Sequence, residues 1–360
     1  MPDLPRPGLP PGPYVGRHSG QRSGPPAAVP GGLPAGYRGR PVTGGDVGAV
    51  HALVAVCERA LYGHVATGAD DIAAELARPG LDPARDTLLV RDASGAPAGW
   101  GWVHGGARSA VDVHPGHRGR GLGSALLSWA EARARASGGT RLVQSLPDAD
   151  TAGARLLRSR GYAPFVTEWL LQIALPTEPE VPRAPAGVTV RPFRPGDERA
   201  AHRLTEDAFG AWQKRRKPYA EWARLTVDRT DFAPALSAVA FAGGRMVGAV
   251  LALDVPGSGE GFIDRVAVRQ DHRGRGLARV LLRESFRAIH RRGGRGCVLW
   301  THSAAGALPL YERLGMTVRR SATVHGVDLG AGARGSAVAP QRPGPPQPPD
   351  DGPQLGTAGG

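Results

Sequence analysis

Cysteine is scarce in this chain, and its scarcity excludes several classes of protein. Cys57 and Cys297 are the only two cysteines among 360 residues, and neither belongs to a cluster with metal-ligand spacing. A disulfide framework and a Cys-based metal site are therefore not expected, and we predict a reduced, cytoplasmic protein that binds no metal. No apolar run approaches the roughly 20 residues that cross a bilayer, and residues 1–36 lack the apolar core of a signal peptide, so we predict no membrane partner.

Lysine is also scarce. Lys214 and Lys217 are the only two, so arginine carries almost all of the net charge of +13. The cations are scattered, and no basic helix is interleaved with exposed aromatic residues, so we predict no specific nucleic-acid partner. Non-specific attraction to polyanions at low salt is a hypothesis that rests on net charge alone.

A seven-residue segment that is rich in glycine and arginine occurs twice. Residues 117–123 read HRGRGLG and residues 272–278 read HRGRGLA, each between a short β-type run and a helix-periodic stretch. The first amides of a helix lack internal partners and carry partial positive charge, and glycine admits phosphate oxygens close to them. The spacing does not fit the dinucleotide-binding pattern G-x-G-x-x-G. Two copies in one setting indicate two phosphate-binding turns rather than chance clusters in a glycine-rich chain.

The repeat extends beyond these turns into two halves of similar length. Arg40-Pro41 with Asp46 matches Arg191-Pro192 with Asp197, and each set predicts a first strand followed by the start of a helix. Two strands joined by a turn, the strand–turn–helix unit, a further strand, a short helix and closing strands follow in each half. We predict disordered tails at residues 1–36 and 331–360, domains at 37–175 and 188–330, and a proline-punctuated linker at 176–187.

This order of elements resembles the GNAT superfamily of N-acetyltransferases. The pyrophosphate signature of that family is Arg/Gln-x-x-Gly-x-Gly/Ala, and residues 118–123 and 273–278 both satisfy it. The resemblance covers about residues 38–330. It implies an α/β (α+β) fold of two tandem GNAT-type domains, each a mixed, mostly antiparallel central sheet flanked by helices. The tandem arrangement is similar to that of mycothiol synthase.

The resemblance also implies that acetyl-CoA is the co-substrate. In the family, the fourth strand splays away from the fifth, and its free backbone groups hold the pantetheine arm and the thioester oxygen. The CoA-binding residues implied in the second half are Val266, Ala267, Val268, Arg273, Gly274, Arg275, Gly276, Leu277, Ala278 and Arg279. Those implied in the first half are Val111, Val113, Arg118, Gly119, Arg120, Gly121, Leu122 and Gly123.

Two side chains of the second half are candidates for proton transfer. Tyr311 resembles the family's helical tyrosine near the CoA sulfur and is the candidate acid for the departing thiolate; the alternative is an aromatic packed under a helix. Asp264 lies where the family often has a Glu and is the candidate base, directly or through a water. The alternative is a carboxylate that is paired with Arg265 or Arg269.

The same spacing in the first half gives no catalytic groups. Asp264 lies nine residues before Arg273, and nine before Arg118 is Ser109. Tyr311 lies four residues before Gly315, and the matching position is Leu157. We therefore predict that the first domain is CoA-binding or structural and that the second is catalytic.

The acceptor is the least determined part of the prediction. We expect an N-acetyltransferase that acts on the primary amine of a small molecule, and a monomer or homodimer. Alternatives are a protein amine, a thiol-cofactor precursor as in mycothiol synthase, and a catalytically silent acyl-CoA-binding protein. Residues 210–234 are expected to line the acceptor site, with Trp212, Tyr219 and Trp222 as pocket or core aromatics and the cations of 214–217 as anion-attracting or solvated.

Overall fold

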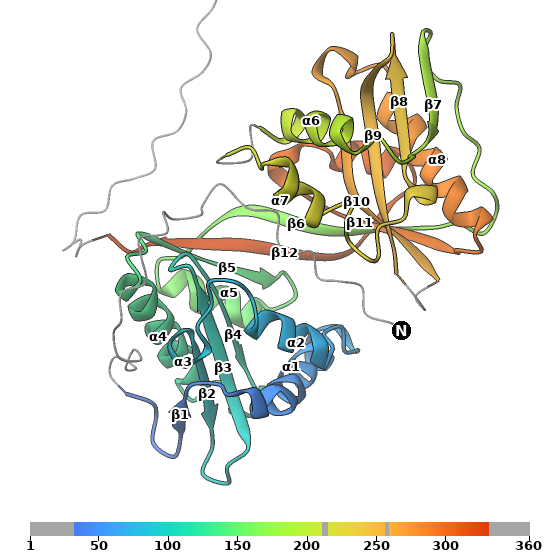
Figure 1. Ribbon diagram of the computed structural model, residues 1–360. Helices are drawn as coiled ribbons and strands as arrows, with labels where there is room; N and C mark the ends of the chain where they lie inside the picture. The colour runs from blue at the N-terminus through green and yellow to red at the C-terminus, as the bar shows by residue number, and fades with distance from the viewer. Residues whose placement is uncertain (1–31, 211–214, 256–258, 331–360) are drawn as a thin grey trace, which may run out of the picture. The chain divides into compact units, whose positions relative to one another are not determined.

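The protein is described by a computed structural model for residues 32–210, 215–255 and 259–330 (Figure 1). The predicted tails fall mainly on residues 1–31 and 331–360, outside the described residues. Gly32 to Gly36, which we assigned to the N-terminal tail, are described, and Leu33 packs against the first core.

The described residues of the first half form six strands and five α-helices. Their order is the one that the sequence predicts, with α2 and α3 added before β2. Their bounds are β1 (Arg38–Arg40), α1 (Val47–Tyr62), α2 (Ala69–Leu76), α3 (Pro83–Asp86), β2 (Thr87–Arg91), β3 (Pro97–His104), β4 (Arg108–Val113), α4 (Leu122–Ala136), β5 (Arg141–Pro147), α5 (Thr151–Ser159) and β6 (Ala163–Ala174).

The second half repeats this order, and its described residues contain no counterpart of α3. Its elements are β7 (Val188–Pro192), α6 (Glu198–Phe209), α7 (Tyr219–Arg224), β8 (Ala238–Ala242), β9 (Arg245–Asp254), β10 (Glu260–Val268), α8 (Leu277–Arg291), β11 (Gly296–His302), α9 (Leu308–Arg313) and β12 (Thr317–Asp328).

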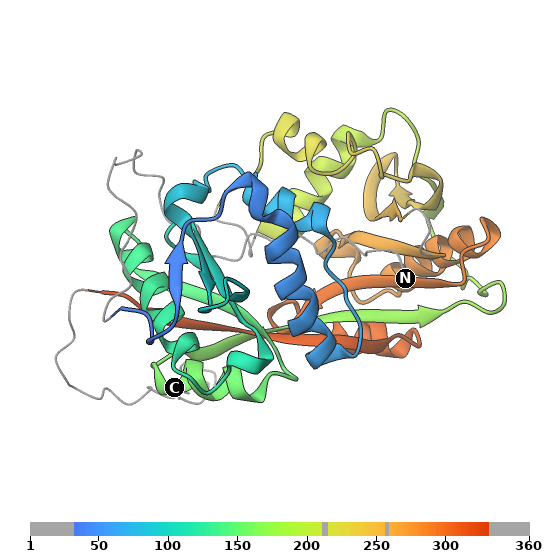
Figure 2. The same ribbon diagram turned by 90° about the horizontal axis from the view of Figure 1, so that it is seen from below.

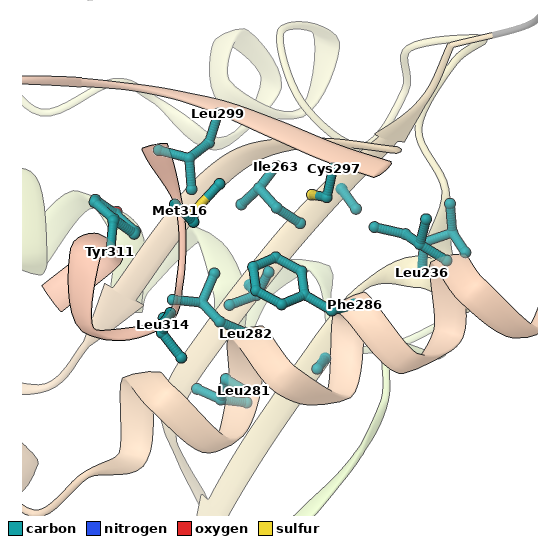
Figure 3. Close-up of a cluster of buried hydrophobic side chains, with 14 of the residues drawn as sticks. Leu236, Ile263, Leu281, Leu282, Phe286, Cys297, Leu299, Tyr311, Leu314 and Met316 are labelled. Carbon is teal, nitrogen blue, oxygen red and sulfur yellow. The ribbon is translucent and has the colours of Figure 1, made fainter. Parts of the chain in front are cut away.

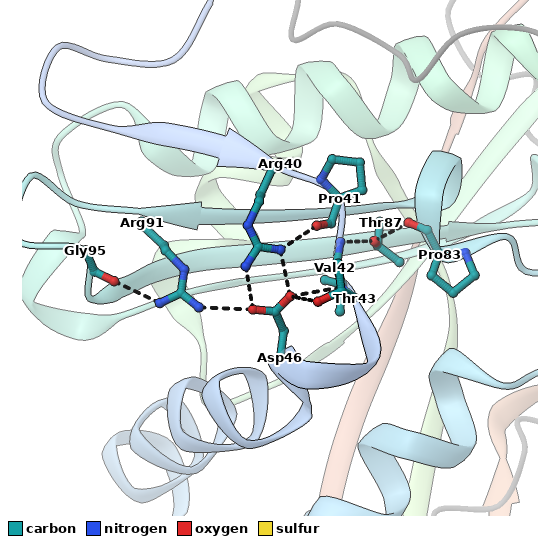
Figure 4. Close-up of polar contacts among 9 residues, drawn as sticks. All are labelled: Arg40, Pro41, Val42, Thr43, Asp46, Pro83, Thr87, Arg91 and Gly95. Atoms are coloured by element: carbon teal, nitrogen blue, oxygen red, sulfur yellow. Dashed lines mark hydrogen bonds and ion pairs between the residues drawn. The ribbon is translucent and has the colours of Figure 1, made fainter.

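The repeated Arg-Pro and Asp residues form the same ion pair in both halves. Arg40 donates two hydrogen bonds to Asp46, at 2.6 and 2.7 Å, and Arg91 adds a third (Figure 4). The hydrogen bond from Arg40 is the main cause that lowers the pKa of Asp46. Arg191 pairs with Asp197 in the same bidentate way, at 2.7 and 2.8 Å. Each pair ties a first strand to the start of the following helix.

All twelve strands form a mixed sheet, in the order β1-β2-β3-β4-β5-β12-β6-β11-β10-β9-β8-β7. The pairs β4/β5 and β10/β11 are parallel, and the other pairs are antiparallel. This confirms the predicted α/β class with a mostly antiparallel sheet flanked by helices.

The closing strands differ from our expectation that each half completes itself. β12 pairs with β5 of the first half, and β6 pairs with β11 of the second. β6 and β12 also pair with each other and lie side by side (Figure 2). The halves therefore exchange their last strands, and each half needs the other to complete its sheet.

A separate hydrophobic core supports each strand–turn–helix unit. Phe286, Leu281 and Leu282 of α8 pack against Ile263 and Leu299 of β10 and β11 (Figure 3). α4 repeats this packing with Leu122, Leu126 and Trp129, which are at most 1 % exposed. Because burying one such side chain stabilises the fold by roughly 1.5–3 kcal/mol, these contacts fix the start of each helix beside its turn.

Candidate active site

Both glycine-rich turns have the backbone conformation that the sequence predicts for phosphate binding. Gly119 and Gly121 have φ values of 76° and 80°, and Gly274 and Gly276 have values of 73° and 77°. Side-chain-bearing residues rarely adopt positive φ, so the conformation itself selects glycine. α4 and α8 start at the next residue, and neither has an acidic residue in its first turn. The first amides of both helices are thus available to an anion.

The fourth and fifth strands of each half separate next to these turns. β10 pairs with β11 only from Glu260 to Ile263, and β4 pairs with β5 only at Arg108 and Ser109. Beyond these pairs, residues 265–268 and 110–113 pair only with the third strand on their other side. This is the splayed arrangement that the resemblance implies.

A cavity of about 1660 Å³ runs along the splayed strands and the turns of both halves. It is large enough for a cofactor and a small substrate. Of the predicted CoA-binding residues, those lining it in the second half are Val266, Ala267, Val268, Arg273, Gly274, Gly276, Leu277, Ala278 and Arg279. Those lining it in the first half are Val111, Val113, Arg118, Gly119, Gly121 and Gly123. Arg120, Leu122 and Arg275 are not among the lining residues, and Leu122 is a core residue.

Tyr311 lies in α9 and borders both the cavity and the core of the second half (Figure 3). Its side chain is buried, and this burial raises the pKa of the hydroxyl to about 12. The hydroxyl therefore carries its proton throughout the neutral range and is able to donate it. Tyr311 is therefore both an aromatic residue packed in the core and a residue that lines the cavity.

Asp264 lies on a β-bulge of β10. Ile263 pairs with Ala252 and Arg265 pairs with Leu251, so Asp264 has no partner residue on β9. The bulge turns Asp264 and Arg265 to the same side, where Asp264 Oδ2 lies 3.1 Å from Arg265 Nε. Both side chains line the cavity. The carboxylate is thus ion-paired and also placed where a substrate can reach it.

This bulge corrects the match between Asp264 and Ser109. Ser109 and Ile263 are the last residues of their strands to pair with the fifth strand. Val113 lies four residues after Ser109, whereas Val268 lies five residues after Ile263. Ser109 therefore matches Ile263, and Asp264 is an inserted residue without a counterpart in β4.

The other comparison between the halves agrees with the sequence spacing. Leu157 of α5 is buried with Leu127, Leu146 and Tyr162 in a small apolar cluster. It supplies no hydroxyl where α9 has Tyr311. Tyr162, five positions further along, is buried, and burial raises the pKa of its hydroxyl.

The segment expected to line the acceptor site is partly core. Trp222 is fully buried and packs with Tyr219 and His202. Arg215 pairs with Glu221 at 2.9 Å, and Arg216 pairs with Asp207. Lys217 does line the cavity. Trp212 and Lys214 lie outside the described residues.

Sequence reasoning missed three charged residues around the cavity, namely Arg229, Arg108 and Glu168. Arg229, which forms a bidentate ion pair with Asp231, lines it near Asp264. His302 lines it at the end of β11, and burial lowers the pKa of its imidazole. Arg108 and Glu168 line it from the first half. These residues lie far apart in the sequence and share no motif, so only the tertiary structure brings them together.

The first glycine-rich turn lies beside the segment of Pro34 and Tyr37, whereas the second turn has no such neighbouring segment among the described residues. The Tyr37 hydroxyl lies 2.8 Å from His117 Nδ1, and a side chain on Gly121 would meet Pro34 at 3.6 Å. Among the described residues, nothing lies within 4 Å of the matching position on Gly276.

The sequence profile of the Acetyltransferase (GNAT) family matches residues 64–162 and 199–316, together more than half of the chain. The chain belongs to this family. Two matches, one in each half, agree with the tandem arrangement seen in the sheet. GNAT proteins use acetyl-CoA as co-substrate, so the protein is an acyltransferase whose turns and splayed strands fit that molecule.

Curated relatives of this GNAT protein are mycothiol acetyltransferases. The chain is 32 % identical to the one from Geodermatophilus obscurus over 246 residues, which cover 64 % of this chain and 78 % of the relative. It is 36 % identical to the one from Thermomonospora curvata over 225 residues, which cover 59 % and 71 %.

Solved structures show the same tandem fold. A GCN5-related N-acetyltransferase from Sphaerobacter thermophilus matches with a TM-score of 0.72 and 30 % identity, over 83 % of this chain and 98 % of that one. A tandem GNAT protein from the clavulanic acid biosynthesis pathway matches with a TM-score of 0.62 and 19 % identity, over 82 % and 99 %. The second likeness concerns the fold alone.

Two features are absent from the residues that the structure describes. None of their helices combines the length and apolarity needed to cross a membrane. Nor do those residues contain a group of three or more His, Cys, Asp and Glu side chains arranged to hold a metal ion.

Proposed function

We propose that this GNAT protein transfers the acetyl group of acetyl-CoA to a primary amine of a small molecule, and that the second half performs the reaction. The observation that carries the proposal is the asymmetry of the cavity. Both halves line it with a phosphate-binding turn and a splayed strand, but only the second adds Tyr311 and Asp264.

The proposed reaction is a direct attack on the thioester. The neutral amine forms a bond to the carbonyl carbon, and the bond from that carbon to sulfur breaks. Tyr311 donates its proton to the departing thiolate and regains one from solvent. The proton that the amine loses passes to Asp264, directly or through a water.

Backbone groups support the carbonyl in this proposal. The edges of Val266, Ala267 and Val268 that face away from β9 are left open by the splay from β11. Successive residues of a strand direct their backbone groups to opposite edges, and Arg269 N donates a hydrogen bond to Val247 O of β9. The amides of Val266 and Val268 therefore face the open edge and are candidates to hold the pantetheine arm and the thioester oxygen, where negative charge develops during attack. Ala267, which lies between them, directs its backbone groups toward β9 and has a buried side chain.

A screen of acceptors tests this proposal. The purified chain is incubated with acetyl-CoA and a panel of small primary amines, and CoA thiol release and the mass of the acetylated product are followed. We expect turnover with at least one amine, which Tyr311→Phe lowers strongly and Tyr162→Phe does not. Turnover that survives in Tyr311→Phe and is lost on substitution in the first half would move the reaction to the other half.

The names of the curated relatives favour one acceptor for inclusion in the panel. Several are mycothiol acetyltransferases at 32–36 % identity. The precursor amine of mycothiol is therefore the second candidate acceptor. A kcat/KM for it that exceeds those for simple amines by at least tenfold would support this narrower function. Equal values would favour a less selective amine acetyltransferase.

A further inference from the structure

Arg108 lines the cavity, and no side chain in the part of the chain that the structure describes forms a hydrogen bond or close ion pair with it. It is partly buried at the start of β4. Among the described residues, no hydrogen bond to its guanidinium and no ion pair within 4 Å is found. Burial lowers the pKa of this side chain, so its charge is held in poorly solvated surroundings. Because a desolvated charge without a partner is costly, it is usually retained where a ligand supplies the partner.

Glu168 is a second poorly compensated charge in the same cavity. The side chain is 8 % exposed and lies in the middle of β6. Among the described residues, Ser145 Oγ donates one hydrogen bond to Glu168 Oε2 at 3.2 Å. Burial is the main cause that raises the pKa of Glu168. A carboxylate has about four acceptor sites, so one donor leaves most of its capacity unused.

The two charges lie on one face of the sheet. Arg108 pairs with Val143 of β5, and Ser145 lies two residues further along the same face. The hydrogen bond from Ser145 shows that Glu168 extends across β12 toward β5. Each charge opposes the effect of burial on the pKa of the other, yet they form no ion pair within 4 Å. They therefore interact electrostatically, and both line the cavity.

Only the first of the two repeated halves has charged residues at these two positions, as far as the described residues show. Phe262 precedes Ile263 as Arg108 precedes Ser109, so the second half has an apolar core residue where the first has arginine. On the closing strands, Ala322 pairs with Pro147 at the end of β5, and Glu168 pairs with His302 at the end of β11. Alanine thus matches Glu168. The fold itself accepts uncharged residues at both positions.

We propose that Arg108 and Glu168 bind a small zwitterion, whose carboxylate group pairs with Arg108 and whose ammonium group pairs with Glu168. An anion alone would face Glu168, and a cation alone would face Arg108. A ligand that carries both charges satisfies both side chains at once. The ligand is either the acceptor itself or a second molecule that binds beside it.

Zwitterions of increasing length test this proposal without any enzymatic turnover. Glycine, β-alanine, γ-aminobutyrate and 6-aminohexanoate separate the same two charged groups by growing spacers, and propionate and propylamine supply one charge each. Melting curves of the full chain are recorded against the concentration of each probe. We expect one spacer length to raise Tm saturably, with an apparent Kd at least tenfold below those of the one-charge probes. If no zwitterion gives a saturable shift, the proposal is wrong.

Substitutions locate the binding. Arg108→Met and Glu168→Gln should each weaken the preferred zwitterion by at least tenfold, and Arg108→Lys should restore part of the affinity. Arg59→Met, which alters an exposed arginine of α1 outside the cavity, should bind like the wild type. Unchanged affinity in both cavity variants would overturn the site.

Stability provides a measurement that does not need a ligand. A carboxyl with a raised pKa makes the folded state bind its proton more tightly, so its destabilising effect grows as pH rises above the unfolded value. Glu168→Gln should therefore have a higher Tm than the wild type at pH 8 and lose this advantage at pH 4. A purely structural Glu168 would give a lower Tm at pH 8.

Product masses distinguish whether the bound zwitterion is the acceptor or a second molecule. If the preferred zwitterion gains an acetyl group in the presence of acetyl-CoA, the site holds the acceptor. If it binds and stays unmodified, the site holds a second molecule. Because binding is measured without acetyl-CoA, the zwitterion site and the proposed acetyl transfer can fail independently.

Discussion

The two halves of the chain share a scaffold and differ in a few residues at its centre. Both have a glycine turn with φ near 75–80°, a helix that starts at the next residue, and a fourth strand that leaves the fifth. The second half adds the bulge residue Asp264 and has Tyr311 where the first has Leu157. The first half adds Arg108 and Glu168 where the second has Phe262 and Ala322.

Under the proposed function, this difference separates the binding of acetyl-CoA from the catalysis of its reaction. The turn and the splay depend on glycine conformation and backbone pairing, which both halves retain. The proposed proton transfers depend on one inserted residue in a strand and one hydroxyl in a short helix. A duplicated scaffold can thus lose or gain catalysis while keeping its fold.

The strand exchange explains why a half without these groups is retained. β6 supplies the strand beside β11, so the second half lacks a neighbour for β11 without it. An unpaired strand edge exposes backbone donors and acceptors and promotes aggregation. The first half therefore completes the sheet of the second, whatever it binds.

The largest effect that separates the halves should come from the tyrosine hydroxyls. Tyr311→Phe should lower kcat by about 100-fold or more if proton donation limits the rate, with little change in KM for acetyl-CoA. Steady-state kinetics with a saturating amine measures this. Tyr162→Phe removes a buried hydroxyl from the first half and should leave kcat within about twofold. A fully active Tyr311→Phe would reverse our assignment.

The pH profile sharpens this prediction. Burial raises the pKa of Tyr311 to about 12, above the usual value near 10. The hydroxyl should therefore remain a proton donor up to at least pH 10, and a loss of kcat between pH 8 and 10 must arise from another group. In Tyr311→Phe, the alkaline limb should keep its position while the plateau falls. A limb that disappears in the variant would contradict the raised pKa.

The next effect should come from the turns. Gly276→Val places a branched side chain at φ 77°, and it should raise KM for acetyl-CoA by about 10- to 100-fold because the turn must move away from the pyrophosphate. Gly121→Val is the matched change in the first half and should spare turnover.

Calorimetry then counts acetyl-CoA sites. Two sites in the wild type and one in each variant would mean that both turns bind, whereas one site in the wild type would make the first half structural.

The fold could be predicted from the sequence because the repeated glycine-rich segment is easily recognised in both halves. Two glycine turns with the same flanking strands and helices define a known arrangement, and a period of one half-chain fixes the rest. The Arg40–Asp46 and Arg191–Asp197 pairs were visible as repeated residues before their contacts were known.

The strand exchange and the bulge could not be predicted in the same way. β6 and β12 have similar lengths and occupy matching places, so either partner satisfies the same backbone hydrogen bonds. Counting back from the turn assumes equal strand geometry, and the bulge at Asp264 shifts that count by one residue. Arg108 and Glu168 lie 60 positions apart, and no spacing rule connects them.

A smaller effect should come from the bulge residue. Asp264→Asn keeps the shape of the side chain and removes the base, so it should lower kcat/KM by about tenfold at pH 6.5, where more of the acceptor amine is protonated. The loss should shrink toward pH 9, where the amine is neutral without help. The control is Asp112→Asn in the first half, at a carboxylate of β4 that accepts a hydrogen bond from Trp100 Nε1 at 3.0 Å. A loss of equal size at both pH values would indicate that Asp264 positions Arg265 rather than accepting a proton.

The smallest effect should come from trimming the chain, and it concerns only the first half. Leu33 is half-buried against the core of α4, and Pro34 and Tyr37 lie beside the first turn. A chain of residues 32–330 should melt like the full chain. A chain of residues 37–330 loses Leu33 and Pro34 and should be about 1 kcal/mol less stable, which corresponds to a Tm lower by about 2–4 °C at this size. Turnover should be unchanged in both, because the second turn has no such neighbour among the described residues.

Two outcomes would contradict these expectations. A drop above about 10 °C for residues 32–330 would show that the removed segments dock on the core. A loss of turnover for residues 37–330 would show that the first turn takes part in the reaction.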